Sequence, residues 1–158
     1  MSSNSTHNSI GIEVTSTQLR AVVISATGEQ VVSRDTALPN LERATIVEQI
    51  TDLVSDMARS AKGRAITDLG IAVPGMVDMS SQRVALSFDI PSLTGMTSSI
   101  VADNSDTTDF YQELKLSTGR DVILINDANA AGYAEFILGA GRGCRNLFYA
   151  TLGAGVGG

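Results

Sequence analysis

The 158-residue chain lacks several features that would place it in particular classes of protein. It has no tryptophan and one cysteine, Cys144, so a disulfide within the chain is impossible and an oxidising compartment is not implied. Its 11 Lys and Arg face 17 Asp and Glu, and this net charge of −6 opposes binding to a phosphate backbone. No apolar run reaches the roughly 18 residues that cross a membrane. Residues 1–9 are polar, unlike a signal peptide. We therefore expect a cytoplasmic protein with neither nucleic-acid nor membrane partners.

The composition that remains, 43% hydrophobic and 18% charged, is typical of a globular domain with a real core. The chain opens with three short segments rich in β-branched residues, at 10–14, 19–25 and 30–36, separated by polar turns. This pattern predicts an antiparallel three-stranded meander. Pro39-Asn40 then ends the sheet, with Asn40 as a candidate N-cap.

After residue 40 the pattern changes to alternating helices and apolar strands. Apolar residues at three- and four-residue steps predict helices near 41–62, 108–118 and 128–139. Nearly continuous apolar runs at 66–73 and 122–125 predict strands buried on both faces, and a further strand is expected at 147–152. The predicted fold class is therefore α/β, with a mixed five-stranded sheet and flanking helices.

Three segments, in order, resemble proteins of the ROK family (repressors, open reading frames and kinases). They are Gly70-Ile-Ala-Val-Pro-Gly-Met-Val-Asp78, Ile125-Asn-Asp-Ala-Asn-Ala-Ala131 with Gly139-Ala-Gly-Arg-Gly143 after it, and Leu152-Gly-Ala-Gly-Val-Gly-Gly158. The resemblance implies the ribonuclease H-like fold of actin-like ATPases and sugar kinases, with only the N-terminal lobe present.

Family members are about twice as long, so the resemblance also implies a division of this chain. Residues 1–9 would be a disordered polar tail, 10–145 the N-terminal lobe, and 146–158 the truncated start of the C-terminal lobe. An apolar strand at 147–152 without its usual neighbours would be an exposed edge. Such an edge predicts pairing between two copies, as a homodimer, or displacement of the segment.

Asn126-Asp127 follows a predicted buried strand and begins a predicted helix. Ligands usually bind at the carboxyl ends of parallel strands, where a carboxylate can accept the proton of an attacking hydroxyl. The same two residues could instead serve only to cap the helix. The family resemblance gives Asp127 the role of general base towards a sugar and gives Asn126 a hydrogen bond to a neighbouring sugar hydroxyl.

Two further residues enter the site through the resemblance. Gly75 follows a strand and would let the backbone approach a sugar, although the local sequence by itself favours an ordinary tight turn. Asp89 stands where the family motif N-x-P-G-W has Asn, but this chain reads Asp89-Ile-Pro-Ser-Leu93, without the Gly and Trp. The identity of the sugar is therefore open.

The phosphate motifs depart further from the family. Kinases carry D-x-G-G-T between their first two strands, and this chain has Glu13-Val-Thr-Ser-Thr17. Thr15 and Ser16 replace both glycines, while Thr17 is kept and Glu13 would bind Mg²⁺ only weakly. In the last motif Gly153 and Gly155 are kept, with Ala154 where a Thr is usual.

These features support two functions. The first is a sugar kinase, whose parent transfers phosphate from ATP with Mg²⁺ to a hexose in a glucokinase-like reaction, the fragment alone being inactive. The alternative is a regulatory protein that senses sugar without phosphorylating it, because the ATP side is eroded. A zinc site is not expected within this chain.

Overall fold

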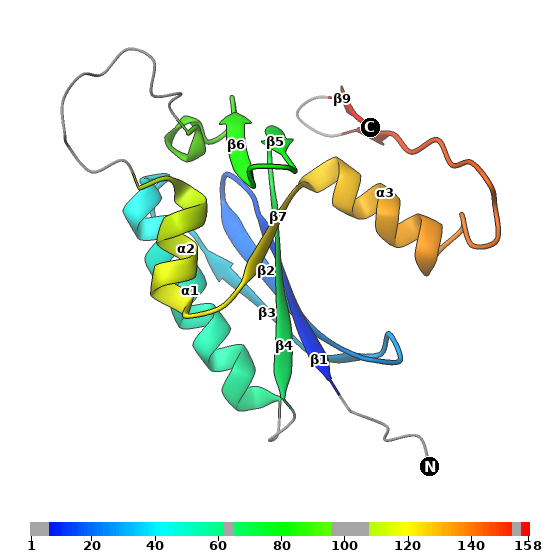
Figure 1. Cartoon of the computed structure of the whole chain (residues 1–158), viewed down its shortest axis with the longest axis horizontal. Coiled ribbons are helices and arrows are strands. Elements are labelled where there is room, and N and C mark those ends of the chain that lie inside the picture. Colours follow the sequence, from blue (N-terminus) through cyan, green and yellow to red (C-terminus); the bar gives the residue numbers. More distant parts are fainter. Residues whose placement is uncertain (1–6, 62–64, 96–107, 153–155) are drawn as a thin grey trace.

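A five-stranded mixed sheet forms the centre of the computed structural model, which describes residues 7–61, 65–95, 108–152 and 156–158 (Figure 1). The strands lie in the order β3-β2-β1-β4-β7. β1, β2 and β3 pair antiparallel, and β4 and β7 extend the sheet in parallel from β1. The predicted sheet and its opening meander are confirmed. The strands are β1 Asn8–Val14, β2 Gln18–Ser25, β3 Gln30–Ala37, β4 Ile66–Val73 and β7 Val122–Asn126.

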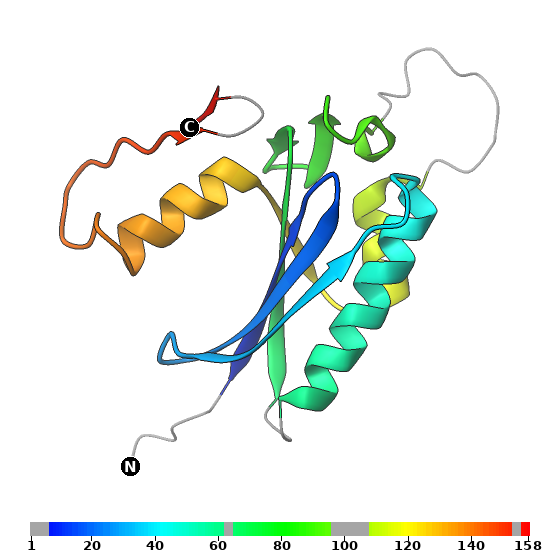
Figure 2. The ribbon, with the colours of Figure 1, turned by 180° about the vertical axis from the view of Figure 1, so that it is seen from behind.

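Two helices, α1 (Arg43–Ser60) and α2 (Phe110–Thr118), lie on one face of the sheet, and α3 (Asp127–Ile137) lies on the other. Figure 2 shows the same division from behind. The predicted helices are confirmed to within a few residues at their ends. The apolar periodicity of α1 becomes its buried face, which is made of Ile46, Val47, Ile50, Leu53, Val54 and Met57.

The core lies between the sheet and the α1–α2 layer. Period-two alternation in β1 and β2 places Ile10, Ile12 and Val14 and their partners from β2 against α1. The same face of β4 and β7 meets the second helix of this layer, where Phe110 and Leu114 are fully buried.

The expectation that β4 and β7 are buried on both faces is wrong. Leu69, Ile71 and Val73 are buried on the α1–α2 face, but Ile123 on the opposite face is 55% exposed. The reason lies in α3, which has one fully buried side chain, that of Ala128, and so covers little of the sheet. Apolar composition predicted the strands, but it does not predict how much of each sheet face the helices cover.

The predicted strand at 147–152 is also wrong. Only β8 (Thr151–Leu152) is a strand there, and it pairs antiparallel with β9 (Val156–Gly157). Residues 147–150 belong to no strand, because an apolar run becomes a strand only where a neighbour satisfies its backbone groups. A homodimer built on this edge would have only the two residues of β8 to pair through, and one side of β8 already pairs with β9.

Smaller differences concern the ends of elements. β1 begins at Asn8, two residues earlier than expected, so residues 8 and 9 pair in the sheet rather than belonging to a tail. The residue before α1 is Glu42, and Asn40 instead accepts a hydrogen bond from its backbone N–H at 2.9 Å. The turn that follows β4 leads into a hairpin of β5 (Met76–Asp78) and β6 (Arg83–Leu86), followed by the 3₁₀ turn η1 (Pro91–Leu93).

Candidate functional site

The carboxyl ends of β4 and β7 lie side by side, and the residues that follow them meet in one cavity of about 630 Å³. All four residues predicted to bind sugar line this cavity, which brings together segments far apart in sequence. They are Gly75, Asp89, Asn126 and Asp127. The site lies at the edge where ligands bind in open α/β sheets.

Asn126 ends β7 and is the N-cap of α3. Its Oδ1 accepts a hydrogen bond from the backbone N–H of Asn129 at 3.0 Å, the usual capping interaction. Its Nδ2 donates to the Gly75 carbonyl oxygen at 2.8 Å and to Asp127 Oδ1 at 3.0 Å. The capping interpretation is therefore confirmed for Asn126. The side chain also holds the turn after β4 and the Asp127 carboxylate in fixed positions.

Asp127 is the first residue of α3 and is half-buried. Its Oδ1 accepts hydrogen bonds from the backbone N–H of Ala128 at 2.8 Å and from Asn126 Nδ2. Oδ2 has no hydrogen-bond partner within the described part of the chain. One carboxylate oxygen is thus fixed by the protein, and the other is available to a ligand in the cavity.

Gly75 has a structural requirement that the sequence alone left open. Its φ of +111° lies in a region that residues with a side chain rarely adopt. A Cβ added there would collide with the carbonyl oxygen of Leu86 and lie 2.8 Å from Ser87 Cα. The absence of a side chain lets the turn after β4 press against the end of β6, which brings this wall of the cavity towards Asn126.

Asp89 lies on the loop between β6 and η1 and is exposed. The loop around it is well fixed, because Ser87 Oγ accepts from the Ile90 N–H at 3.2 Å and the Ser87 N–H donates to Thr94 Oγ1 at 3.0 Å. Ile90 and Leu93 are fully buried beneath the loop. The carboxylate of Asp89 therefore reaches the cavity from an anchored backbone.

The residues of the first phosphate motif, Glu13 and Thr15–Thr17, do not line this cavity. The β1–β2 turn lies at the same end of the sheet as the β5–β6 hairpin (Figure 1), yet its residues are not among those that line the site. Thr15 closes the turn, since its Oγ1 donates to the Gln18 carbonyl oxygen at 2.9 Å and accepts from the Gln18 N–H at 3.0 Å. Ser16 and Thr17 are exposed.

The second phosphate motif is only partly described. Gly153 and Gly155 fall outside the described residues, but Val156, Gly157 and Gly158 line the cavity. A Cβ on Gly157 would lie 3.3 Å from Ala128 Cβ, so the β8–β9 hairpin passes close to the first turn of α3. The sequence analysis did not assign these last three residues, although they continue the glycine-rich motif.

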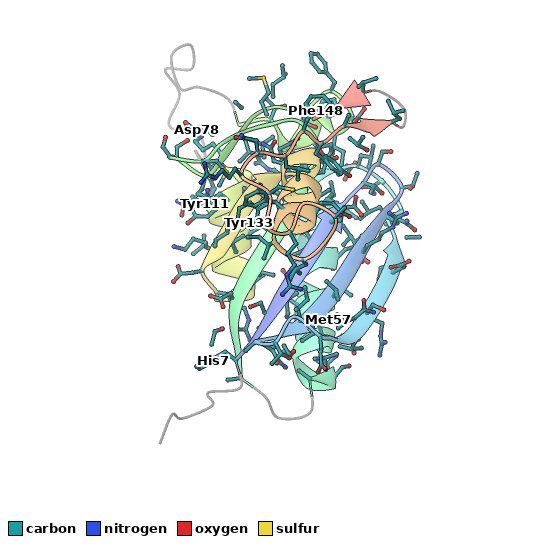
Figure 3. The ribbon with its side chains drawn as sticks, turned by 90° about the vertical axis from the view of Figure 1, so that its right-hand side faces the viewer. His7, Met57, Asp78, Tyr111, Tyr133 and Phe148 are labelled. Carbon is teal, nitrogen blue, oxygen red and sulfur yellow. The ribbon has the colours of Figure 1, made fainter. Side chains whose placement is uncertain are left out.

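The geometry does not fit the predicted weak Mg²⁺ site at Glu13. Its Oε2 lies 3.3 Å from Arg20 Nη1, so the carboxylate is paired with a cation. The described residues contain no cluster of three or more His, Cys, Asp or Glu that could hold a metal ion. They also contain no helix long and apolar enough to span a membrane. His7 lies at the far end of the molecule from Asp78 and Phe148 (Figure 3).

A residue that the sequence analysis missed lies in the turn between β5 and β6. Gln82 has φ +56°, which makes it the one non-glycine residue with positive φ in the described ranges. Such a conformation costs roughly 1–2 kcal/mol for a residue with a side chain. Its Oε1 accepts a hydrogen bond from the Leu124 N–H at 2.6 Å. Nothing in a polar turn of this composition signals a contact with a strand 42 residues further on.

The sequence is similar to known proteins of one family. The sequence profile of the ROK family matches residues 9–158. A glucokinase of Streptomyces coelicolor is 29% identical over 152 residues, which are 94% of this chain and 42% of that protein. A xylose repressor of Bacillus spizizenii is 26% identical, with 94% of this chain and 36% of the repressor covered.

Among solved structures, the chain is similar to a ROK family glucokinase of Streptomyces griseus in complex with glucose and AMPPNP. The TM-score is 0.76 at 25% identity, over 95% of this chain and 43% of that one. The fold is thus that of the ROK sugar kinases, and the chain spans about two fifths of the length of these glucokinases. Because the family profile covers nearly all of the sequence, this chain belongs to the ROK family.

Proposed function

We propose that this chain is the sugar-binding lobe of a ROK hexose kinase, with a glucose-like sugar as acceptor and ATP as phosphoryl donor. The observation that carries the proposal is the meeting of Gly75, Asp89, Asn126 and Asp127 around one cavity. In this scheme residues 10–145 form the lobe and residues 146–158 begin a second one. A glucokinase relative of more than twice this length, and a solved relative that contains glucose, support it.

The chemistry follows from the two oxygens of Asp127. Oδ1 is held by the Ala128 N–H and by Asn126 Nδ2, which fixes the carboxylate plane. Oδ2 then accepts the proton of a sugar hydroxyl. The oxygen of that hydroxyl bonds to the γ-phosphorus of ATP, and the bond between the γ-phosphorus and the ADP oxygen breaks. Fixing one oxygen keeps the base oriented without occupying the oxygen that reacts.

The phosphate side favours the second candidate, a regulatory protein that binds sugar without phosphorylating it. The hydroxyl of Thr15 is used to close the β1–β2 turn, where the family motif has a glycine backbone for phosphate. Glu13 is paired with Arg20. A xylose repressor is among the relatives, in agreement with such a role. In both candidates the cavity binds the same class of ligand, and they differ only in whether phosphate is transferred.

Sugar binding is tested by titrating the 158-residue chain with D-glucose and following backbone amide resonances by NMR. The expected result is saturable shifts at Gly75, Asp89, Asn126 and Asp127, with none at residues 30–37 of β3. L-Glucose, which has the same composition and opposite handedness, is the control and should produce no saturable shift. Absence of saturation by D-glucose, or shifts remote from the cavity, would overturn the proposal.

Phosphoryl transfer needs a separate measurement. The isolated chain is expected to form no glucose 6-phosphate from ATP, since it spans only about two fifths of the length of the glucokinases that it resembles. If this chain is part of a longer protein, the same coupled assay on that protein separates the two candidates. Turnover near 1 s⁻¹ or above, the low end of ordinary enzymes, supports the kinase. Saturable glucose binding without turnover supports the sensor.

A further inference from the structure

The β5–β6 hairpin forms one wall of the candidate sugar site and is attached to β7 at two points. At its base, the Gly75 carbonyl oxygen accepts a hydrogen bond from Asn126 Nδ2 at 2.8 Å. At its tip, Gln82 Oε1 accepts from the Leu124 N–H at 2.6 Å. Leu124 and Asn126 are two residues apart on the same strand. The hairpin is therefore attached to the last three residues of β7, the end of the strand that leads into the cavity.

The contact made by Gln82 uses a group that the sheet itself leaves unpaired. β7 is an edge strand that pairs only with β4 among the described strands, and Leu124 is opposite Ile71 in that pairing. An edge N–H that points away from the sheet needs another acceptor when it is removed from water. The Gln82 carboxamide supplies this acceptor, in place of a backbone carbonyl from a sixth strand.

Both ends of the Gln82 carboxamide are used, which fixes its orientation. Nε2 donates to the Met79 carbonyl oxygen at 3.0 Å while Oε1 accepts from Leu124. Exchanging the two atoms would place a donor against an N–H and an acceptor against a C=O. The side chain of Gln82 is thus held at both ends, and its backbone is left-handed.

The rest of the tip is equally well fixed. Asp78 Oδ1 accepts from the N–H and the hydroxyl of Ser80 at 2.9 and 2.7 Å, and Oδ2 accepts from Ser81 Oγ at 2.8 Å. On the far strand of the hairpin, Arg83 Nε lies 3.1 Å from Asp109 Oδ2. The hairpin is thus a braced unit, and its displacement would move both Gly75 and the loop that carries Asp89.

We infer that Gln82 is a positioning residue for the candidate sugar site. Its hydrogen bond to the Leu124 N–H attaches the β5–β6 hairpin to β7 and so sets the distance between Gly75 and Asn126–Asp127. Gln82 does not line the cavity, and its effect on a ligand is transmitted through Leu124 and the two residues after it. The inference rests on the proposed function only for the ligand, a hexose. The hydrogen bond between Gln82 and Leu124 is present in the protein without sugar.

Gln82→Asn is the informative variant. Asn tolerates positive φ better than other residues with side chains, so the turn can persist, but it is one methylene too short to reach Leu124. Gln82→Glu is the matched control for the contact with β7, because its carboxylate has the same length and still accepts from the Leu124 N–H. It loses the hydrogen bond to the Met79 carbonyl oxygen, which lies within the turn itself. Gln82→Gly removes the cost of positive φ together with the hydrogen bond to Leu124. It serves as the second variant without this bond if the Asn variant does not fold.

Three NMR readouts on the 158-residue chain test the inference. In Gln82→Asn, amide exchange at Leu124 should accelerate, the Asn126 side-chain NH₂ resonances should shift, and the dissociation constant for D-glucose should rise roughly tenfold, since a small misplacement of binding groups is costly. The melting temperature should stay close to that of the unaltered chain. Gln82→Glu should restore the Asn126 resonances and most of the glucose affinity.

Faster exchange at Leu124 with unchanged Asn126 resonances and unchanged glucose affinity would overturn the inference, because the contact would then be purely local. If the unaltered chain binds no glucose, the proposed function fails, and the Asn126 resonances alone decide the role of Gln82. Shifted resonances in Gln82→Asn that return in Gln82→Glu then support it, and unshifted resonances overturn it.

Discussion

Asn126 and Gly75 are joined by a hydrogen bond of 2.8 Å from the side-chain Nδ2 of one to the carbonyl oxygen of the other, although 51 residues separate them. The bond links the turn after β4 to the first turn of α3. Asn126 also caps α3 and donates a hydrogen bond to Asp127. One side chain therefore connects the turn after β4, the start of α3 and the Asp127 carboxylate.

Gly75→Ala should lower the free energy of unfolding by at least about 2 kcal/mol, because a Cβ meets the Leu86 carbonyl and the backbone is left-handed. Gly70→Ala is the control five residues earlier, within β4, where an added Cβ meets nothing within 4 Å. That control should change stability by less than about 1 kcal/mol. Urea denaturation of both variants provides the comparison, and equal losses would contradict the packing argument.

Asn8→Leu should stabilise the chain by about 1–2 kcal/mol. Asn8 is 1% exposed on the apolar face of β1, and neither its Oδ1 nor its Nδ2 has a hydrogen-bond partner in the described structure. Leucine has a similar shape and no polar atoms to desolvate. Thermal denaturation measures the gain. Asn8→Asp, which buries a charge at the same place, should be destabilising, and a loss of stability in Asn8→Leu would show that the carboxamide is satisfied in solution.

The hydroxyls of Ser80 and Ser81, followed by their backbone N–H groups, lower the pKa of Asp78 from its ordinary 3.8 to about 2. Because the folded-state value is the lower one, the stabilisation that Asp78 contributes is complete above pH 3.8 and is lost as the pH falls towards 2. Titration of the Asp78 carboxyl carbon by NMR should give a value near 2. In Ser80→Ala/Ser81→Ala the pKa should rise towards 3.8, and an unchanged pKa would exclude the hydroxyls as the cause.

Asp127→Asn should separate binding from catalysis in a kinase that contains this chain. The amide keeps a group that can bond to a sugar hydroxyl but removes the base, so turnover should fall by roughly 10²–10⁴-fold while glucose affinity is largely kept. Asp35→Asn, an exposed carboxylate on β3, is the control and should leave both unchanged. An unaltered turnover number would show that Asp127 serves only the start of α3.

The sequence was sufficient to predict the sheet and its helices, because their signals are local. The alternation in β1 and β2 and the three- and four-residue spacing in α1 each report a face that must be buried. The strand expected at 147–152 failed because its signal, apolar composition, says nothing of a partner strand. Phe148 in that segment is 90% exposed.

Four members of the candidate site could be predicted, but the residues of β8 and β9 beside them and the contacts between them could not. The family motifs brought Gly75, Asp89, Asn126 and Asp127 together, and the cavity contains all four. The contact of Gln82 could not be predicted, since its partner is a strand formed 42 residues later. The hydroxyl of Thr15 likewise acquires its role only when the turn closes on Gln18.

The position of β1 in the middle of the sheet has a consequence for the order of folding. Its residues pair on one side with β2, a few residues later in the chain, and on the other side with residues 66–72. During synthesis the meander can form as soon as it leaves the ribosome. The opposite edge of β1 stays unpaired until α1 and then β4 have been synthesised. Such distant pairings slow folding, and the waiting edge is exposed to other chains. Nascent chains that stop before residue 66 should therefore engage chaperones more than those that extend past β7.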